Sequence, residues 1–286
     1  MRTYPSRVRA PYDPSMTPPP VIDSPAWVRV DAADPAPWRM AGNPSVVHLG
    51  HSALVLGAGR RQLVITSDAF GLVPGGMQVR PPEFARLRRD LARRDPARGA
   101  AIHGWRPAVV EPADLRVTAI DIDSAALDLL ERATTAPGAI GAFDPSRQRA
   151  EASALARAAR DGADVADTLL RLIGAGPGST PAGDDVVAGV LAGLRAAGLS
   201  EAAAELGARV LPLLGRTTAA STHYLEAAAT GRFADRVHAL VAGLRSARSA
   251  PAAIRAAATF GASSGTDLLA GIVAGARITP AIRKSA

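Results

Sequence analysis

The chain has 286 residues, 48% of them hydrophobic, so it can bury a large core in one large or two modest domains. It contains no cysteine, which excludes a disulfide framework, a thiolate nucleophile and any cysteine-ligated metal centre. The net charge of +7 does not indicate a nucleic-acid partner, because Lys284 is the only lysine, the arginines are dispersed and aromatic residues make up only 4%.

The first part of the chain is a proline-rich stretch. Residues 1–24 carry scattered arginines and too few apolar residues to offset the entropy of ordering, so we predict a disordered arm there. No signal-peptide-like apolar region opens the chain, and no stretch reaches roughly 18 uninterrupted apolar residues. We therefore expect no membrane span and a cytoplasmic location.

Residues 25–140 have the pattern of a β-rich domain. Short apolar runs at residues 45–49, 53–56 and 62–66 alternate with glycines and predict strands. A helical pattern interrupts them at residues 82–94, a further strand is predicted over residues 109–122, and Ser124 is expected to cap a helix that runs to Ala133. Pro137 and Gly138 mark the expected domain boundary.

Residues 141–286 are rich in alanine, leucine and arginine, with apolar residues at helical spacing. This composition predicts a helical domain, and the whole chain is therefore assigned to the α+β class. Two segments resemble each other: the run GDDVVAGVLAG from Gly183 returns as GTDLLAGIVAG from Gly265. Two glycines four residues apart weaken a helix unless backbones approach closely there, so we expect these two helices to abut and to bring their N-terminal ends to a shared site.

The segment from Gly174 to Asp185 is a glycine-rich loop that leads into the first of these helices. Thr180 is a candidate N-cap and Pro181 a candidate first residue, and exposed backbone N–H groups at a helix N-terminus favour a phosphate or carboxylate. The loop lacks the lysine of a Walker motif and the surroundings of a dinucleotide fingerprint.

Three aspartates, Asp184, Asp185 and Asp267, open the two similar helices. They can simply complement the helix dipoles, or they can meet and hold a divalent cation or an amide nitrogen of a substrate. Magnesium is the candidate cation.

A second polar cluster runs from Arg216 to Thr222. An arginine beside several hydroxyl groups suits an anion, although the hydroxyls can equally be helix caps. His223 is expected to be packed or exposed, and His48 with His51 is a weak metal signal because no third ligand is nearby.

These motifs, together with Ala228–Phe233 and Gly261–Gly271, resemble the AllH-type subunit family of oxamate carbamoyltransferase over about residues 150–277. The family is often described as a domain of unknown function and is associated with anaerobic allantoin degradation, a branch of purine catabolism. The resemblance implies a multisubunit enzyme that exchanges a carbamoyl group between phosphate and oxamate.

The function expected from the sequence is therefore a carbamoyltransferase subunit that binds a small anionic substrate, such as carbamoyl phosphate or an oxamate-like compound, and assembles with other transferase subunits. The alternative is a non-catalytic subunit that only binds a metabolite or phosphate. The candidate catalytic residues are Asp185, Asp267 and Arg216. The candidate substrate-binding residues are Gly176, Gly178, Ser179, Thr180, Gly183, Asp184, Thr217, Thr218, Ser221, Ser264 and Gly265.

Overall fold

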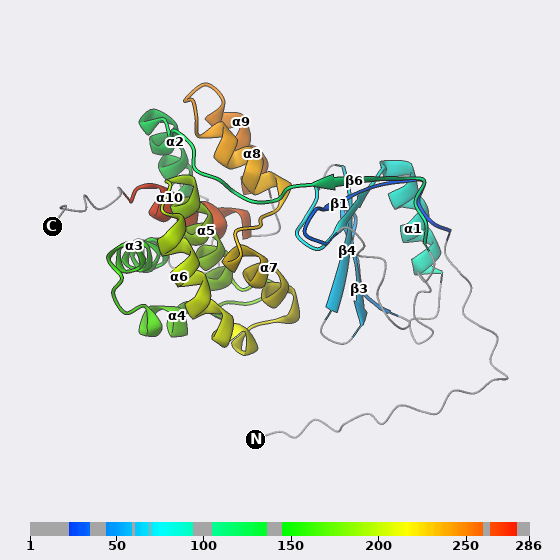
Figure 1. The fold of residues 1–286 in the computed structure, drawn as a ribbon, viewed down its shortest axis with the longest axis horizontal. Coiled ribbons are helices and arrows are strands. Elements are labelled where there is room, and N and C mark those ends of the chain that lie inside the picture. Colours follow the sequence, from blue (N-terminus) through cyan, green and yellow to red (C-terminus); the bar gives the residue numbers. More distant parts are fainter. Residues whose placement is uncertain are drawn as a thin grey trace, which may run out of the picture.

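The computed structural model describes residues 23–34, 44–58, 61–68, 70–93, 105–135, 145–259 and 264–278. They form a sheet-containing part and a helical part that lie side by side (Figure 1). The α+β class expected from the sequence is confirmed. Most of the predicted arm and the predicted boundary at Pro137 lie outside the described residues.

The first part is a mixed six-stranded sheet in the order β2-β3-β4-β5-β1-β6. Strands β2, β3 and β4 form an antiparallel meander, β4 pairs with β5 in parallel, β5 pairs with β1 antiparallel, and β1 pairs with β6 in parallel. The strands are β1 (Trp27–Asp31), β2 (Ser45–Leu49), β3 (Ala53–Ala58), β4 (Arg61–Ser67), β5 (Met77–Val79) and β6 (Val109–Ala113).

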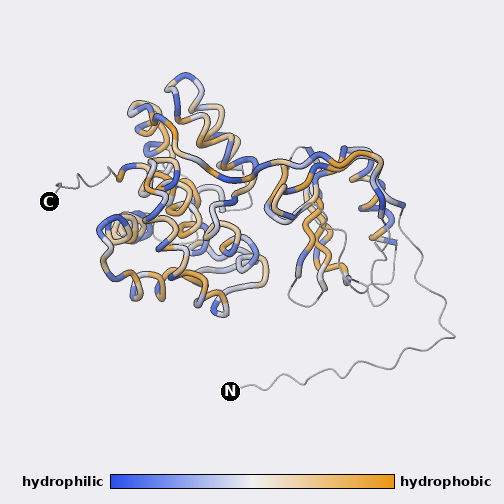
Figure 2. The backbone as a smooth tube through the Cα atoms, viewed as in Figure 1, coloured by the Kyte–Doolittle hydropathy of each residue, from blue (hydrophilic) through white to orange (hydrophobic). Residues whose placement is uncertain are grey.

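Apolar side chains on one face of this sheet form its core. In β3, successive side chains point to opposite faces of the sheet, and this alternation buries Leu54 and Leu56 completely. The strands of the sheet are mostly hydrophobic along their length (Figure 2). Helix α1 (Pro81–Ala92) covers this core with Phe84, Leu87 and Leu91, which recur at helical spacing on its buried face.

The strand predicted over residues 109–122 is shorter than expected. Strand β6 ends at Ala113, and the chain then crosses to the helical part. There Leu115 O accepts a hydrogen bond from Phe233 N at 2.8 Å, and Val117 N donates to Gly231 O at 3.0 Å. These partners lie in another segment, which local sequence does not reveal.

The next helix, α2 (Ser124–Thr135), packs in the helical core although the expected boundary near residue 140 placed it with the sheet. Its buried residues Ala126, Leu127 and Leu130 belong to the core that also contains the helices after residue 145. Its cap is Asp123, whose Oδ1 accepts from Ala125 N at 2.8 Å, and not Ser124.

The helical part surrounds α5, a helix of which 12 residues are buried. Helix α5 spans Ala182–Ala196. Besides α2, the other segments of this part are α3 (Pro145–Asp161), α4 (Ala166–Leu172), α6 (Ser200–Val210), the 3-10 helix η2 (Leu211–Arg216), α7 (Ala219–Ala229), α8 (Asp235–Gly243), α9 (Ala250–Ala258) and α10 (Ser264–Ala276). None of the helices in the described part of the chain is long and apolar enough to cross a membrane.

Within the described residues, two ion pairs join the sheet-containing part to the helical part. Strand β1 supplies Arg29 and Asp31, and the segment before and at the start of α8 supplies Arg232 and Asp235. Arg29 Nη1 pairs with Asp235 Oδ2, and Arg232 Nη1 pairs with Asp31 Oδ2 at 2.6 Å. Asp31 is only 1% exposed, so this second pair satisfies a buried charge.

Candidate functional site

Helices α5 and α10 run side by side in the same direction, in contact through their glycines. A Cβ atom on Gly189 would lie 2.9 Å from Gly271 Cα, and one on Gly193 would lie 2.9 Å from Gly275 Cα. A Cβ on Gly271 would lie only 2.2 Å from Val186 O. Real Cβ atoms do not approach backbone so closely, so only glycine permits this packing. The abutting helices expected from the repeated motif are confirmed.

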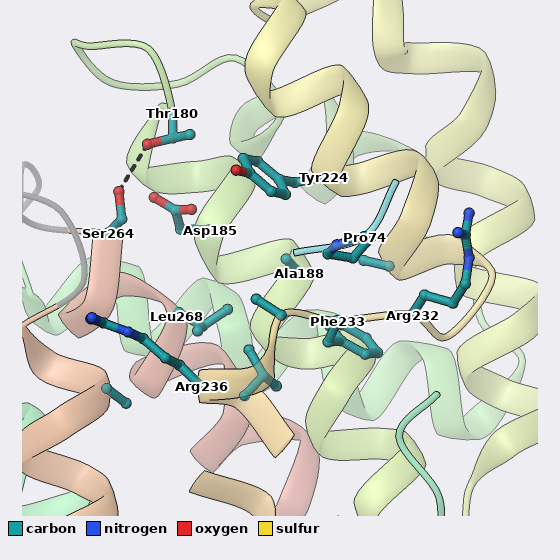
Figure 3. Close-up of a pocket in the computed structure, with 14 residues that line it drawn as sticks. Pro74, Thr180, Asp185, Ala188, Tyr224, Arg232, Phe233, Arg236, Ser264 and Leu268 are labelled. Carbon is teal, nitrogen blue, oxygen red and sulfur yellow. Dashed lines mark hydrogen bonds between the residues drawn. The ribbon is translucent and has the colours of Figure 1, made fainter. Parts of the chain in front are cut away.

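Because the two helices are parallel, their N-terminal ends lie at the same end of the pair. There the hydroxyl groups of Thr180 and Ser264 are hydrogen-bonded at 2.8 Å, with Asp185 beside them (Figure 3). The Asp185 and Asp267 carboxylates are close enough to interact electrostatically. The sequence therefore anticipated which two helix ends meet.

The three aspartates at these ends have different surroundings. Asp184 is 2% exposed and holds neighbouring chain segments: its Oδ1 accepts from Gly174 N at 2.8 Å, and its Oδ2 accepts from the Thr217 hydroxyl. Asp267 is fully buried, and its Oδ1 accepts from Gln148 Nε2 at 2.7 Å. Both carboxylates thus have protein partners that fix the fold around the helix ends.

Asp185 is the aspartate that faces a cavity. Its Oδ2 is buried and has no hydrogen-bond partner within the described part of the chain. Burial raises the pKa of this carboxyl well above its usual value; a hydrogen bond with Ser264 lowers it by less, and the Asp267 and Asp184 carboxylates raise it further. The carboxyl group is therefore biased toward its neutral, protonated form.

The cavity that Asp185 faces lies at the N-terminal ends of α5 and α10, and we call it the helix-tip cavity. It has a volume of about 60 Å³, enough for a few water molecules or one small polar metabolite. Apolar side chains, among them Phe233 and Leu268, form most of its wall, and Pro74 contributes from the sheet part (Figure 3). Its polar lining residues are Thr180, Asp185, Tyr224, Arg232, Arg236 and Ser264.

Tyr224 is one of the polar lining residues that were not predicted from the sequence. Its hydroxyl points toward Asp185 in Figure 3. Burial raises the pKa of Tyr224 to about 12, and the Asp185 charge contributes to the shift, so the phenol keeps its proton. A usable signal existed, because Ser221, Tyr224 and Ala228 recur at the spacing of one helix face.

Arg232 and Arg236 were also not proposed, although Arg232 belongs to a segment that carried the family resemblance. Arg232 turns toward Asp31 of the sheet part, whereas Arg236 extends on the Ser264 side of the cavity (Figure 3). Arg236 Nε donates to Phe70 O at 3.1 Å, which fixes this side chain across the junction of the two parts.

The glycine-rich loop lies mostly outside the cavity. Gly176, Gly178 and Ser179 are exposed, and of the loop's side chains Thr180 reaches the cavity wall. Helix α5 begins at Ala182 with Pro181 as its N-cap, so the expected cap at Thr180 is wrong. The Thr180 hydroxyl is engaged with Ser264 instead.

Most of the predicted polar cluster serves the protein itself. Thr218 caps α7 by accepting from Ser221 N at 3.1 Å and donates to Ser179 O. Ser221 is buried, and its hydroxyl has no partner among the described residues. Arg216 is exposed and donates to Leu170 O at 3.4 Å, so its side chain does not contribute to the cavity lining.

The two remaining candidate glycines are packing positions. A Cβ on Gly183 would lie 2.0 Å from Leu172 O, and one on Gly265 would lie 2.4 Å from Ala257 O. They allow α5 and α10 to start against α4 and α9.

The described residues contain no group of three side chains arranged to hold a metal ion. His48 and His51 are exposed in the sheet part. His223 is packed, as expected, with Nε2 donating to Pro74 O at 2.7 Å.

Part of the chain is similar to a known protein family. The family model described as oxamate carbamoyltransferase subunit AllH matches residues 172–276, which include both similar helices and all the polar lining residues named above. The resemblance noted from the sequence is confirmed over this segment. No curated protein and no solved structure matches the chain.

Proposed function

We propose that this chain is a subunit of a carbamoyltransferase that acts on oxamate, or a related small amide or carboxylate, with carbamoyl phosphate. The observation that carries the proposal is that the segment matched by the AllH family supplies every residue that lines the helix-tip cavity except Pro74, and this cavity has the size for a small polar metabolite. The chain works with other transferase subunits, in the cytoplasm, and serves purine catabolism through allantoin.

The proposed reaction transfers a carbamoyl group from a phosphate oxygen of carbamoyl phosphate to the amide nitrogen of oxamate. The oxamate amide nitrogen attacks the carbonyl carbon of carbamoyl phosphate; a C–N bond forms, the C–O bond to phosphate breaks, and the nitrogen loses a proton. Such a step needs no covalent intermediate on the protein. It requires reactants held in position and hydrogen-bond donors at the oxygens that gain charge.

The cavity offers suitable groups for holding one of the two reactants. The hydroxyls of Tyr224, Thr180 and Ser264 and the carboxyl of Asp185 meet at its helix-tip end, and Arg236 supplies a cation on the Ser264 side. Asp267 lies behind Asp185, where it supports the cluster without lining the cavity. Arg216 lies outside the cavity, and we propose that it acts at the exposed end of η2, where phosphate or a partner subunit can reach it.

The first experiment is binding to the purified chain. A ligand at 100 times its dissociation constant adds about 2.7 kcal/mol of stability, which raises the melting temperature by about 4–6 °C for a chain of this size. Oxamate, oxalurate, carbamoyl phosphate and inorganic phosphate are tested separately, each with and without magnesium. If all leave melting unchanged, the helix-tip cavity is not the substrate site.

The second experiment separates an enzyme subunit from a metabolite-binding one. The chain is reconstituted with its partner subunits, and formation of oxalurate from oxamate and carbamoyl phosphate is followed with wild type and Tyr224→Phe. We expect turnover that falls at least tenfold in the variant. Turnover unaffected by Tyr224→Phe and by Asp185→Ala would favour a binding or scaffolding subunit.

A further inference from the structure

The Asp185 carboxyl group has one oxygen atom that can still form a hydrogen bond with a ligand. Its Oδ2 is buried at the cavity wall without a partner in the described part of the chain, while its other interaction is with Ser264 on the neighbouring helix. A buried polar atom left unpaired costs free energy, so such atoms in native proteins are rare and call for a reason. A ligand that reaches Oδ2 supplies that reason.

The charges around Asp185 determine which form of the group meets the ligand. Asp184 lies on its own helix, Asp267 on α10, and the neutral Tyr224 phenol on α7. Of the two arginines that line the cavity, Arg232 is committed to Asp31 and Arg236 contacts Phe70, through its carbonyl oxygen and over its ring. Asp185 thus faces two carboxylates and a phenol at close range.

We propose that Asp185 binds the ligand as a neutral carboxylic acid, donating a hydrogen bond from Oδ2 to an oxygen atom of a small carboxylate or amide. The inference rests on the proposed function and names the chemical group of the substrate that this end of the cavity receives. The neutral form is favoured because burial and the adjacent carboxylates all disfavour a further negative charge.

This assignment separates oxygen-bearing ligands from cations and amines. An ionised Asp185 would accept from an N–H group or bind a divalent cation, whereas a protonated one offers a donor. Among the described residues, no group of three histidine, aspartate or glutamate side chains is arranged to hold a metal ion, which favours the donor role for Asp185 over a cation site. The oxygen acceptor is consistent with a ligand such as oxamate, whose anionic end Arg236 can balance.

The test compares two substitutions in the full chain. Asp185→Asn keeps the shape and a donor but cannot ionise, and Asp185→Ala removes the donor. Oxamate binding is measured by calorimetry between pH 6 and pH 9. We expect Asp185→Asn to bind within about threefold of wild type at pH 6 and Asp185→Ala to bind at least tenfold more weakly. Wild-type affinity should fall as the pH rises, while that of Asp185→Asn should change less.

Three results would overturn the inference. One is loss of binding in Asp185→Asn as large as in Asp185→Ala; another is wild-type affinity that strengthens with pH. The third is stabilisation by magnesium alone that disappears in Asp185→Asn, which would assign Asp185 to a cation. Oxamate binding and turnover that survive in wild type would leave the proposed function standing in each case.

A second measurement needs no ligand. Because the folded-state pKa of Asp185 is raised, the wild-type protein loses stability as the pH rises from about 4 toward that pKa. The difference in melting temperature between Asp185→Asn and wild type should therefore grow with pH. Asp161→Asn is the matched control: the Arg160 partner lowers the pKa of Asp161, so its contribution is lost only below about pH 4, and the difference for Asp161→Asn should stay constant above that pH. A difference for Asp185→Asn that is constant with pH overturns the inference even if no ligand is found.

Discussion

Replacing Gly271 with alanine places a methyl group directly at the contact between α5 and α10. The new Cβ would lie 2.2 Å from Val186 O and 2.8 Å from Val190 N, both backbone atoms of a buried helix. To reach an ordinary contact the helices must separate by about 1 Å, and overpacking of this kind costs roughly 1–3 kcal/mol or more. Alanine regains about 1 kcal/mol of helix propensity.

Because both backbone contacts fall below 3 Å, we take the upper end of this cost, about 3 kcal/mol. Less the regained propensity, Gly271→Ala should lower the free energy of unfolding by about 2 kcal/mol, or about 3–5 °C in melting temperature. Calorimetry or circular dichroism measures this, with Gly215→Ala as the control because a Cβ there meets nothing within 4 Å. Separation of the helices should also move Asp185 from Ser264 and weaken oxamate binding. A Gly271→Ala protein as stable as Gly215→Ala would refute the close packing from which the helix-tip cavity is built.

Three further substitutions probe the surroundings of the cavity. Asp184→Ala removes the acceptor of two hydrogen bonds and should destabilise the protein by about 2–4 kcal/mol in urea unfolding. Burial lowers the pKa of His223, so stability should fall as the pH drops below about 6.5; a His223→Gln protein should lose less over pH 7 to 5, and equal losses would contradict this. Arg232→Ala leaves Asp31 buried without its cation and should cost about 2–4 kcal/mol, whereas Arg277→Ala at an exposed pair should cost less than about 1 kcal/mol.

The helix pair could be predicted because its signals are local. Glycines at i and i+4 in two similar segments are visible in the sequence, and their only stable use inside helices is close approach. Short strands at residues 45–49 and 53–56 were predicted for the same reason, since alternation and glycine punctuation lie within a few residues.

The roles of individual polar residues could not be predicted in the same way. Asp184 and Asp185 are neighbours with identical side chains, and only the 100° turn between successive helical positions sends one to Gly174 and the other to the cavity. Arg216 suited an anion by chemistry, but it ends the 3-10 helix η2 with its side chain at the surface. Pro74 enters the cavity from the other part of the chain, which no local pattern records.

The partner of α5, helix α10, is the last helix among the described residues. Twelve residues of α5 are buried in the folded protein, many of them against α10, so much of this surface stays uncovered until α10 has been synthesised. At a translation rate of about 5–20 residues per second, α10 is synthesised on the order of several seconds after α5. A nascent or truncated chain that ends before Ser264 therefore exposes the apolar surface of α5 that α10 would cover. Such a surface would recruit a chaperone or promote aggregation, and the glycines that shape the mature site are part of it.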